Sequence, residues 1–153
     1  MILYTFSDGG ARGNPGPAAI GVVLCEPGGK IIAETAECVG EMTNNKAEYR
    51  AMLKALELAR SHKARKLLCH GDSELLIYQL QGLYRIKNAE LKMLAEKVKL
   101  AAGAFEAVTW KQVPREHPMI TRADKLLNRA LNRAKAKAPP KPVTQDLDQR
   151  ELF

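Results

Sequence analysis

The order of strand-like and helical segments constrains the fold of this 153-residue chain more than any other feature. Three apolar, β-rich runs come first, and turn sequences rich in glycine and proline separate them. Because such short connections favour antiparallel pairing, these runs predict a three-stranded meander. The expected strands are residues 2–7 (ILYTFS), 18–25 (AAIGVVLC) and 31–39 (IIAETAECV).

The pattern then changes to helices that alternate with strands. Residues 45–62 are dominated by helix-forming side chains, and Asn88 is a suitable N-cap for a later helix. The remaining expected elements are a strand at 65–71, helices at 73–81 and 89–102, a strand at 107–113 and a helix at 120–136. This order predicts an α/β fold: one five-stranded mixed sheet, with three antiparallel strands then two parallel ones, and helices on both faces.

The chain length fits one domain followed by a tail. Consecutive prolines in KAKAPPKP cannot continue a helix, so we expect residues 1–134 to form the domain and 135–153 a linker and tail. No apolar run is long enough to span a membrane, and the N-terminus lacks the pattern of a signal peptide. The three cysteines lie in strand-like stretches, which suits buried thiols in a reducing cytoplasm. The net charge of +7 favours a polyanionic partner, although it also serves solubility.

Four carboxylates stand where chemistry is possible. Asp8 and Asp72 follow apolar strands, and ligands of open α/β sheets bind beyond the carboxyl ends of strands. Glu48 starts the apolar face of the first helix, and Asp124 lies in the first turn of the last one. Three of them also have a local interpretation: Asp72 or its neighbour Ser73 as an N-cap, Glu48 in a capping box with Asn45, and Asp124 as an acid favoured by the helix dipole.

Considered together, the four acids indicate a metal site. Converging carboxylates repel one another unless cations neutralise them, and Mg²⁺ or Mn²⁺ prefers oxygen ligands. Two such ions can support hydrolysis of a phosphodiester. The sequence contains no GxGxxG, GxxxxGK[ST] or GxSxG pattern, and its three histidines lack metal-ligand spacing.

Four motifs, SDGGARGNPGPAAIG, TNNKAEYRAML, HGDSELL and VPREHPMITRADKLLNRAL, resemble those of type 1 ribonuclease H in order and spacing. The resemblance covers about residues 1–134. It implies a metal-dependent endonuclease that cleaves the RNA strand of RNA/DNA hybrids and leaves 5′-phosphate and 3′-hydroxyl ends. It assigns two Mg²⁺ or Mn²⁺ ions to Asp8, Glu48, Asp72 and Asp124.

The resemblance also implies substrate contacts. Gly9, Gly10 and Ala11 would let the backbone approach the minor groove, where ribose hydroxyls are displayed. Asn14, Asn44 and Asn45 match contacts to the hybrid, and Thr43 matches a contact to a DNA phosphate.

The chain departs from the family pattern at three points. The loop before the last acid often carries a histidine that assists proton transfer or product release, and both His117 and Arg115 are candidates for that role. The segment after Asp72 is too short for the basic, Trp-rich protrusion of some members, and Glu74 replaces a frequent glutamine.

The C-terminal QRELF resembles the short peptide that binds the bacterial sliding clamp. Gln149, Leu152 and Phe153 would be its contacts, and Arg150 departs from the usual leucine. Alternatively, the two apolar residues fold back onto the domain.

Other functions remain open on the sequence alone. They are a non-catalytic module that binds RNA/DNA hybrids, a nuclease with another substrate preference, and a clamp-tethered interaction protein. We expect a monomer.

Overall fold

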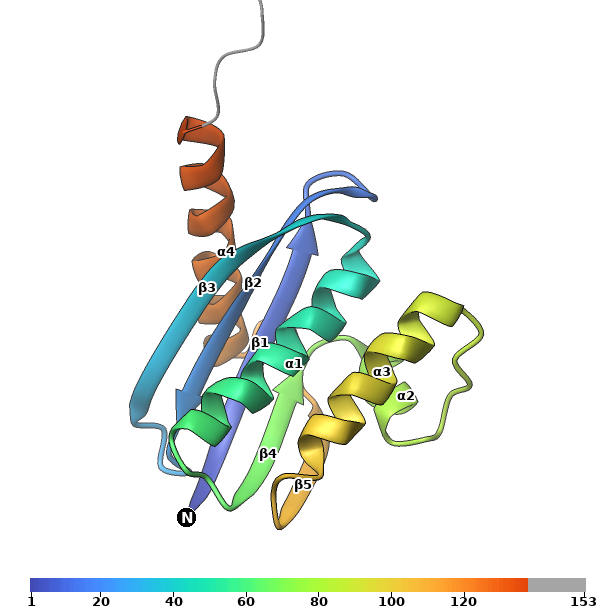
Figure 1. The fold of residues 1–153 in the computed structure, drawn as a ribbon. Coiled ribbons are helices and arrows are strands. Elements are labelled where there is room, and N and C mark those ends of the chain that lie inside the picture. The colour runs from blue at the N-terminus through green and yellow to red at the C-terminus, as the bar shows by residue number, and fades with distance from the viewer. Residues whose placement is uncertain (138–153) are drawn as a thin grey trace, which may run out of the picture.

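A computed structural model of the chain describes residues 1–137, so the expected linker and tail from 138 onward lie outside the described residues. Figure 1 shows a single sheet with helices on both sides. The elements are β1 (Ile2–Ala11), β2 (Gly16–Cys25), β3 (Ile31–Met42), α1 (Asn44–Ser61), β4 (Lys66–Gly71), α2 (Glu74–Leu80), α3 (Ala89–Ala102), β5 (Ala107–Gln112) and α4 (Pro118–Lys137). No helix within residues 1–137 is long and apolar enough to cross a membrane.

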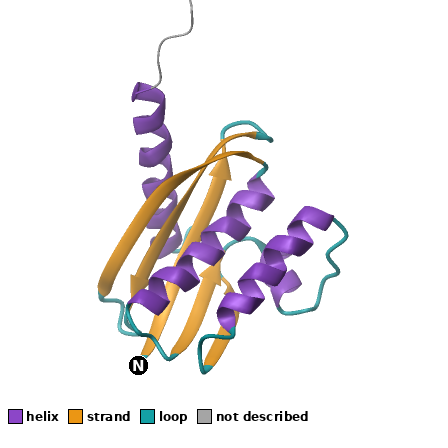
Figure 2. Ribbon diagram, in the orientation of Figure 1, coloured by secondary structure: helices purple, strands orange, loops and turns teal. Residues whose placement is uncertain are grey.

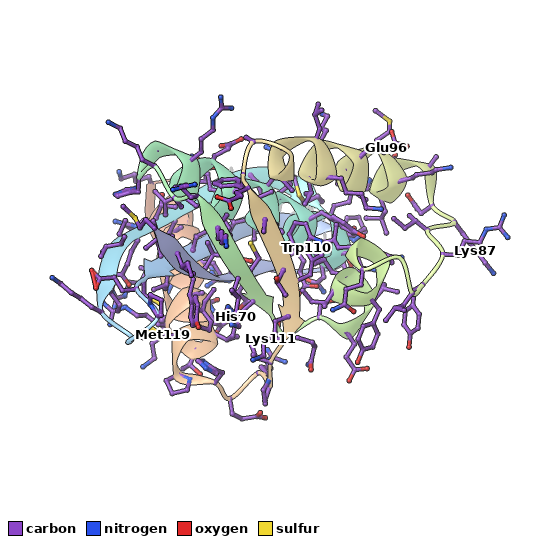
Figure 3. The ribbon with its side chains drawn as sticks, turned by 90° about the horizontal axis from the view of Figure 1, so that it is seen from below. His70, Lys87, Glu96, Trp110, Lys111 and Met119 are labelled. Carbon is purple, nitrogen blue, oxygen red and sulfur yellow. The ribbon has the colours of Figure 1, made fainter. Side chains whose placement is uncertain are left out.

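The predicted sheet topology is confirmed. The five strands lie in the order β3-β2-β1-β4-β5, with β1, β2 and β3 antiparallel and β4 and β5 parallel to β1. The secondary-structure colouring of Figure 2 shows these strands as one layer between helices. In the end-on view of Figure 3, α1 and α3 lie on one side of the sheet and α4 lies on the other.

Two apolar layers hold the helices to the sheet. One face of the sheet, with Leu3, Leu67 and Cys69, packs under α1 and α3. The opposite face contacts α4 through Phe6, Val23 and smaller residues. Burial of each apolar face therefore fixes the side on which each helix lies, and with it the ends of the elements that carry the four acids.

The capping prediction at α3 is confirmed, whereas the expected burial of one cysteine is wrong. Asn88 accepts hydrogen bonds from the backbone N–H groups of Glu90 and Leu91. The last helix reaches Lys137, close to the end expected at residue 136. Cys25 and Cys69 are buried thiols, but Cys38 is exposed because β3 is an edge strand.

Candidate active site

Asp8 lies inside β1. The sequence had predicted a strand that ends at residue 7, with Asp8 directly after it. Residues 8–11 continue to pair with β2, where Asp8 opposes Gly21 and Ala11 opposes Ala18. The parallel pairing of β1 with β4 stops earlier, at Phe6 and His70. The carboxyl group of Asp8 therefore stands on a strand that extends beyond its neighbour, at the edge where β4 ends.

Glu48 reaches Asp8 because α1 approaches β1 very closely. A Cβ atom added to Gly9 would lie 2.3 Å from the carbonyl oxygen of Ala47 and 2.6 Å from the backbone nitrogen of Glu48. Only glycine tolerates that contact, so the glycine-rich stretch permits the approach of helix and strand.

The N-cap of α1 is Thr43 and not Asn45. Its hydroxyl oxygen accepts a hydrogen bond from the backbone N–H of Lys46, at 3.3 Å. Asn45 already lies within the helix, so Glu48 does not form the expected capping box. The carboxylate of Glu48 is therefore available to the pocket.

Asp72 and Asp124 come from two further elements. Asp72 lies between β4 and α2, and the hydroxyl of Ser73, not Asp72, caps α2 by accepting from Leu76 N–H. Asp124 lies on α4, which approaches β2 at another glycine. A Cβ atom on Gly21 would lie 2.1 Å from the carbonyl oxygen of Ala123.

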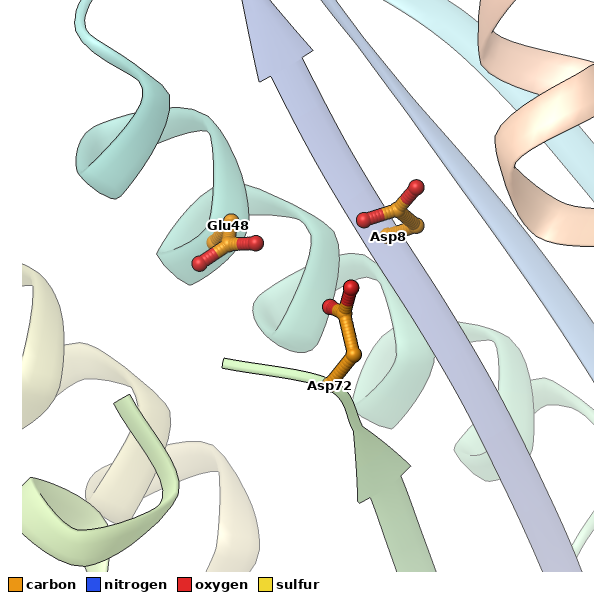
Figure 4. Close-up of side chains that lie close together, drawn as sticks. All are labelled: Asp8, Glu48 and Asp72. Carbon is orange, nitrogen blue, oxygen red and sulfur yellow. The ribbon is translucent and has the colours of Figure 1, made fainter. Parts of the chain in front are cut away.

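The structure brings three of the four acids together. One carboxylate oxygen from each of Asp8, Glu48 and Asp72 lies within 4.8 Å of the others, as Figure 4 illustrates. Asp124 stands outside that trio, but it lines the same pocket of about 580 Å³ and contributes to the raised pKa of Asp8. Within residues 1–137, no other group of three or more His, Cys, Asp or Glu side chains converges in this way.

Burial and mutual repulsion raise the pKa values of these acids. Burial first, then the charges of Asp72 and Glu48, raise the pKa of Asp8 to about 9. Burial and Asp72 raise the pKa of Glu48 to about 7, although Ser73 and Arg115 oppose the shift. Burial also raises the pKa of Asp72, again against Arg115. A cluster of this kind favours either protons or bound cations.

Comparisons with known proteins agree with this arrangement. Residues 6–130 match the family model described as reverse transcriptase-like. A ribonuclease HI from Halobacterium salinarum is 37% identical over 86% of this chain and 65% of its own length. The bifunctional protein Rv2228c of Mycobacterium tuberculosis is 35% identical over 88% of this chain. The chain spans only 65% and 36% of the lengths of these two relatives.

Among solved structures, LC11-RNase H1 in complex with an RNA/DNA hybrid superposes with a TM-score of 0.81 at 36% identity, over 86% of this chain and 98% of that one. This chain belongs to the type 1 ribonuclease H family. The predicted family and its fold are therefore confirmed.

The structure separates the two loop candidates of this family member. Arg115 lines the acid pocket. His117 does not line it; its ring stacks on Phe6 with centroids 4.9 Å apart, and its Nδ1 accepts a hydrogen bond from the backbone N–H of Met119. His117 thus satisfies a free N–H at the start of α4, whereas Arg115 faces the carboxylates.

The expected substrate contacts surround the acids. The pocket is lined by Gly9, Gly10, Ala11, Asn44 and Asn45. A neighbouring pocket of about 570 Å³ is lined by Asn14, Thr43 and Asn45. The two pockets share Asn45 and are therefore adjacent.

Three further polar residues of the pocket were not predicted as site residues: Arg12, Ser73 and Asn128. Asn128 follows Asp124 by four positions in a helix, so the two share a face, and helical spacing could have found it. Arg12 lies inside the glycine-rich motif, but no local pattern indicates where its side chain points. Gln149, Leu152 and Phe153 fall outside the described residues, and the clamp-binding tail stays a prediction.

Proposed function

We propose that this protein is an endonuclease that hydrolyses the RNA strand of RNA/DNA hybrids and leaves 5′-phosphate and 3′-hydroxyl ends. The observation that carries the proposal is the convergence of Asp8, Glu48 and Asp72, with ligand oxygens within 4.8 Å of one another. The hybrid complex of the similar LC11-RNase H1 supports the choice of substrate.

The acids fit a pair of Mg²⁺ or Mn²⁺ ions. All donors are carboxylate oxygens, which these ions prefer. Burial and then mutual repulsion raise the pKa values of Asp8 and Glu48, and a bound cation would offset both effects. Asp8, Glu48, Asp72 and Asp124 would hold the ions. When bound, the ions supply activation of the attacking water and stabilisation of the leaving oxygen.

Arg115 assists by charge and not by proton transfer. Its guanidinium opposes the rise in the pKa values of Glu48 and Asp72, and so favours the ionised forms that bind cations. An arginine stays protonated at all working pH values, so it suits a contact to the phosphate at the cleaved bond. His117 is held at the start of α4, and we assign it no chemical role.

The surface beside the acids accounts for the preference for RNA. Gly9, Gly10 and Ala11 present backbone without bulky side chains, and Asn14, Asn44 and Asn45 offer amides that can bond a 2′-hydroxyl. The hydroxyl oxygen of Thr43 accepts the helix-cap bond, so its proton remains free for a DNA phosphate. We further propose action as a monomer in the cytoplasm, where free thiols persist.

The test uses labelled substrates of one sequence: an RNA/DNA hybrid, a DNA duplex and an RNA duplex, each incubated with Mg²⁺ and with Mn²⁺. We expect internal cuts confined to the RNA of the hybrid, with 5′-phosphate ends, and none from the Asp72→Asn variant. Binding of the hybrid without cleavage in either metal would favour the non-catalytic module. Equal cutting of the DNA duplex would refute the proposed recognition of the 2′-hydroxyl.

A further inference from the structure

Arg12 joins the connection between β1 and β2 to the far half of α4. Its Nη2 donates to Oδ1 of Asn132 at 2.7 Å, to Oδ1 of Asn128 at 3.3 Å and to the carbonyl oxygen of Asn128 at 3.4 Å. All three acceptors are neutral. Two asparagines, one turn apart on α4, therefore fix the guanidinium in place without neutralising it.

The charge of Arg12 has no acidic partner within residues 1–137, and hydrogen bonds there use only its Nη2. The remaining N–H groups, on Nη1 and Nε, stay available on an exposed side chain. A pre-oriented guanidinium with unused donors is suited to a phosphate, which it can bind with two parallel hydrogen bonds. An arginine that served packing alone would not need unused N–H groups on Nη1 and Nε.

The position of Arg12 connects it to the acids. It lines the same pocket as Asp8 and Asp124, and this pocket continues along α4 past Asn128 to Leu131. Figure 1 shows that the last turns of α4 extend past the ends of the strands. A strand whose scissile bond lies at the acids has further phosphates on either side, and one direction along the pocket leads to Arg12.

The loop that carries Arg12 is also fixed on its other side. The backbone N–H of Ala11 donates to Oδ1 of Asn44 at 2.8 Å, and the backbone N–H of Asn44 donates to Oδ1 of Asn14 at 3.0 Å. The connection between β1 and β2 is thus held by α1 and by α4 at once. Arg12 and the asparagines beside α1 then keep a constant separation across the pocket.

We propose that Arg12, held by Asn128 and Asn132, binds one backbone phosphate of the RNA/DNA hybrid next to the cleavage site. This inference rests on the proposed function, because it takes the hybrid as the ligand. The contact reads no base. It adds affinity for the strand that lies over the acids, through the charge of one phosphate.

The first test compares Arg12→Gln with Arg60→Gln, a matched loss of one positive charge near the other end of α1. Hybrid binding is measured in an Asp72→Asn background, which prevents cleavage, at several salt concentrations. We expect Arg12→Gln to weaken binding about 10- to 100-fold, the range of a charged hydrogen bond. The slope of log affinity against log salt should fall by about 0.9, the value of one phosphate contact. Arg60→Gln should change neither quantity.

The second test locates the phosphate. Hybrids with one neutral methylphosphonate linkage at a time, in either strand, are bound to the parent protein and to Arg12→Gln. At one position near the cleavage site, the neutral linkage should weaken hybrid binding by the parent protein but not by Arg12→Gln. In the active protein Arg12→Gln should raise KM and leave kcat nearly unchanged, and Asn132→Ala should do the same to a smaller extent.

The results separate this inference from the proposed function. If Arg12→Gln binds like Arg60→Gln, or loses kcat and thermal stability with an unchanged salt slope, then Arg12 is a structural tie and the inference is overturned. A uniform response to every neutral linkage would also overturn it. A parent protein that binds the hybrid but never cuts it would refute the proposed catalysis, while the phosphate scan would still report on Arg12.

Discussion

The contact of β1 with α1 at Gly9 sets the spacing of two acids, so Gly9→Ala should damage both stability and activity. The new Cβ would lie 2.3 Å from the carbonyl oxygen of Ala47, whereas ordinary contacts of a Cβ begin at 3.4 Å. Because both sides are backbone, no side chain can rotate away, and strand and helix must separate by about 1 Å. Glu48 follows Ala47 directly, so its carboxylate would move away from Asp8 by a similar amount.

Both consequences have an expected size. Overpacking of this kind costs about 1–3 kcal/mol in the free energy of unfolding. At about 2–4 °C for each kcal/mol, Tm should fall by several degrees. A displacement of about 1 Å within a catalytic group can cost about 100-fold in rate, so kcat on the hybrid should fall steeply in Mg²⁺.

Thermal unfolding by circular dichroism and cleavage of a labelled hybrid measure the two effects. Gly10→Ala is the matched control for unfolding, since its Cβ would meet only Leu127 Cδ1 at an ordinary 3.6 Å, and its Tm should stay close to the parent value. If Gly9→Ala keeps the parent Tm and kcat, then close approach at Gly9 does not position Glu48. A lower Tm with full activity would show that the site tolerates the displacement.

Three more predictions follow from the same structure. The raised pKa of Asp8, about 9, means that the metal-free folded protein binds a proton that the unfolded chain has lost. The free energy of unfolding of the metal-free protein should therefore fall as pH rises from about 4 to 9, by at most about 1.4 kcal/mol per pH unit for this group. With EDTA present, Asp8→Asn should make this dependence on pH weaker. A steeper dependence in the variant would contradict the raised pKa of Asp8. Gly21→Ala should lower both Tm and the rate of hybrid cleavage, because its Cβ would lie 2.1 Å from the carbonyl oxygen of Ala123 and would push away the adjacent Asp124. An unchanged Tm would refute this close contact. Tyr49→Phe should cost about 1–3 kcal/mol in urea unfolding, because it removes the buried hydroxyl that donates to Gln79 Oε1 at 2.5 Å, and Gln79→Leu in the same background should recover part of that loss.

Much of the fold could be predicted because its signals are local. Turn sequences separate the strands, helix-forming residues fill α1 and α3, and a single asparagine at position 88 caps α3. The predicted ends of helices and strands were wrong where several local signals compete. Three consecutive residues, Thr43, Asn44 and Asn45, are all good N-caps, and only the path of the chain out of β3 selects Thr43. The glycines after Asp8 predict a turn, yet pairing with β2 keeps them in the strand.

For the candidate site, too, the sequence could predict the types of residue but not the contacts between them. The motifs predicted that four acids converge, and the structure places three of them together and the fourth in the same pocket. They could not predict how the acids meet, since that depends on close approaches between segments far apart in sequence, at Gly9 and Gly21. The choice between Arg115 and His117 also required tertiary packing, because only the structure shows His117 against Phe6.

The position of the Arg12 side chain is the clearest example of a feature that no local sequence pattern predicts. Its partner Asn132 lies 120 positions away, and Asn128 lies 116 positions away, so neither a helical nor a strand period relates them. The two asparagines leave the charge of Arg12 intact, whereas a carboxylate at the same place would cancel it. The neutral acceptors therefore hold the side chain in position and keep its charge for a ligand, in the same pocket whose other end gathers carboxylates. Under the proposed function, the cationic end would hold a backbone phosphate of the hybrid, and the carboxylates at the other end would hold the metal ions that support cleavage.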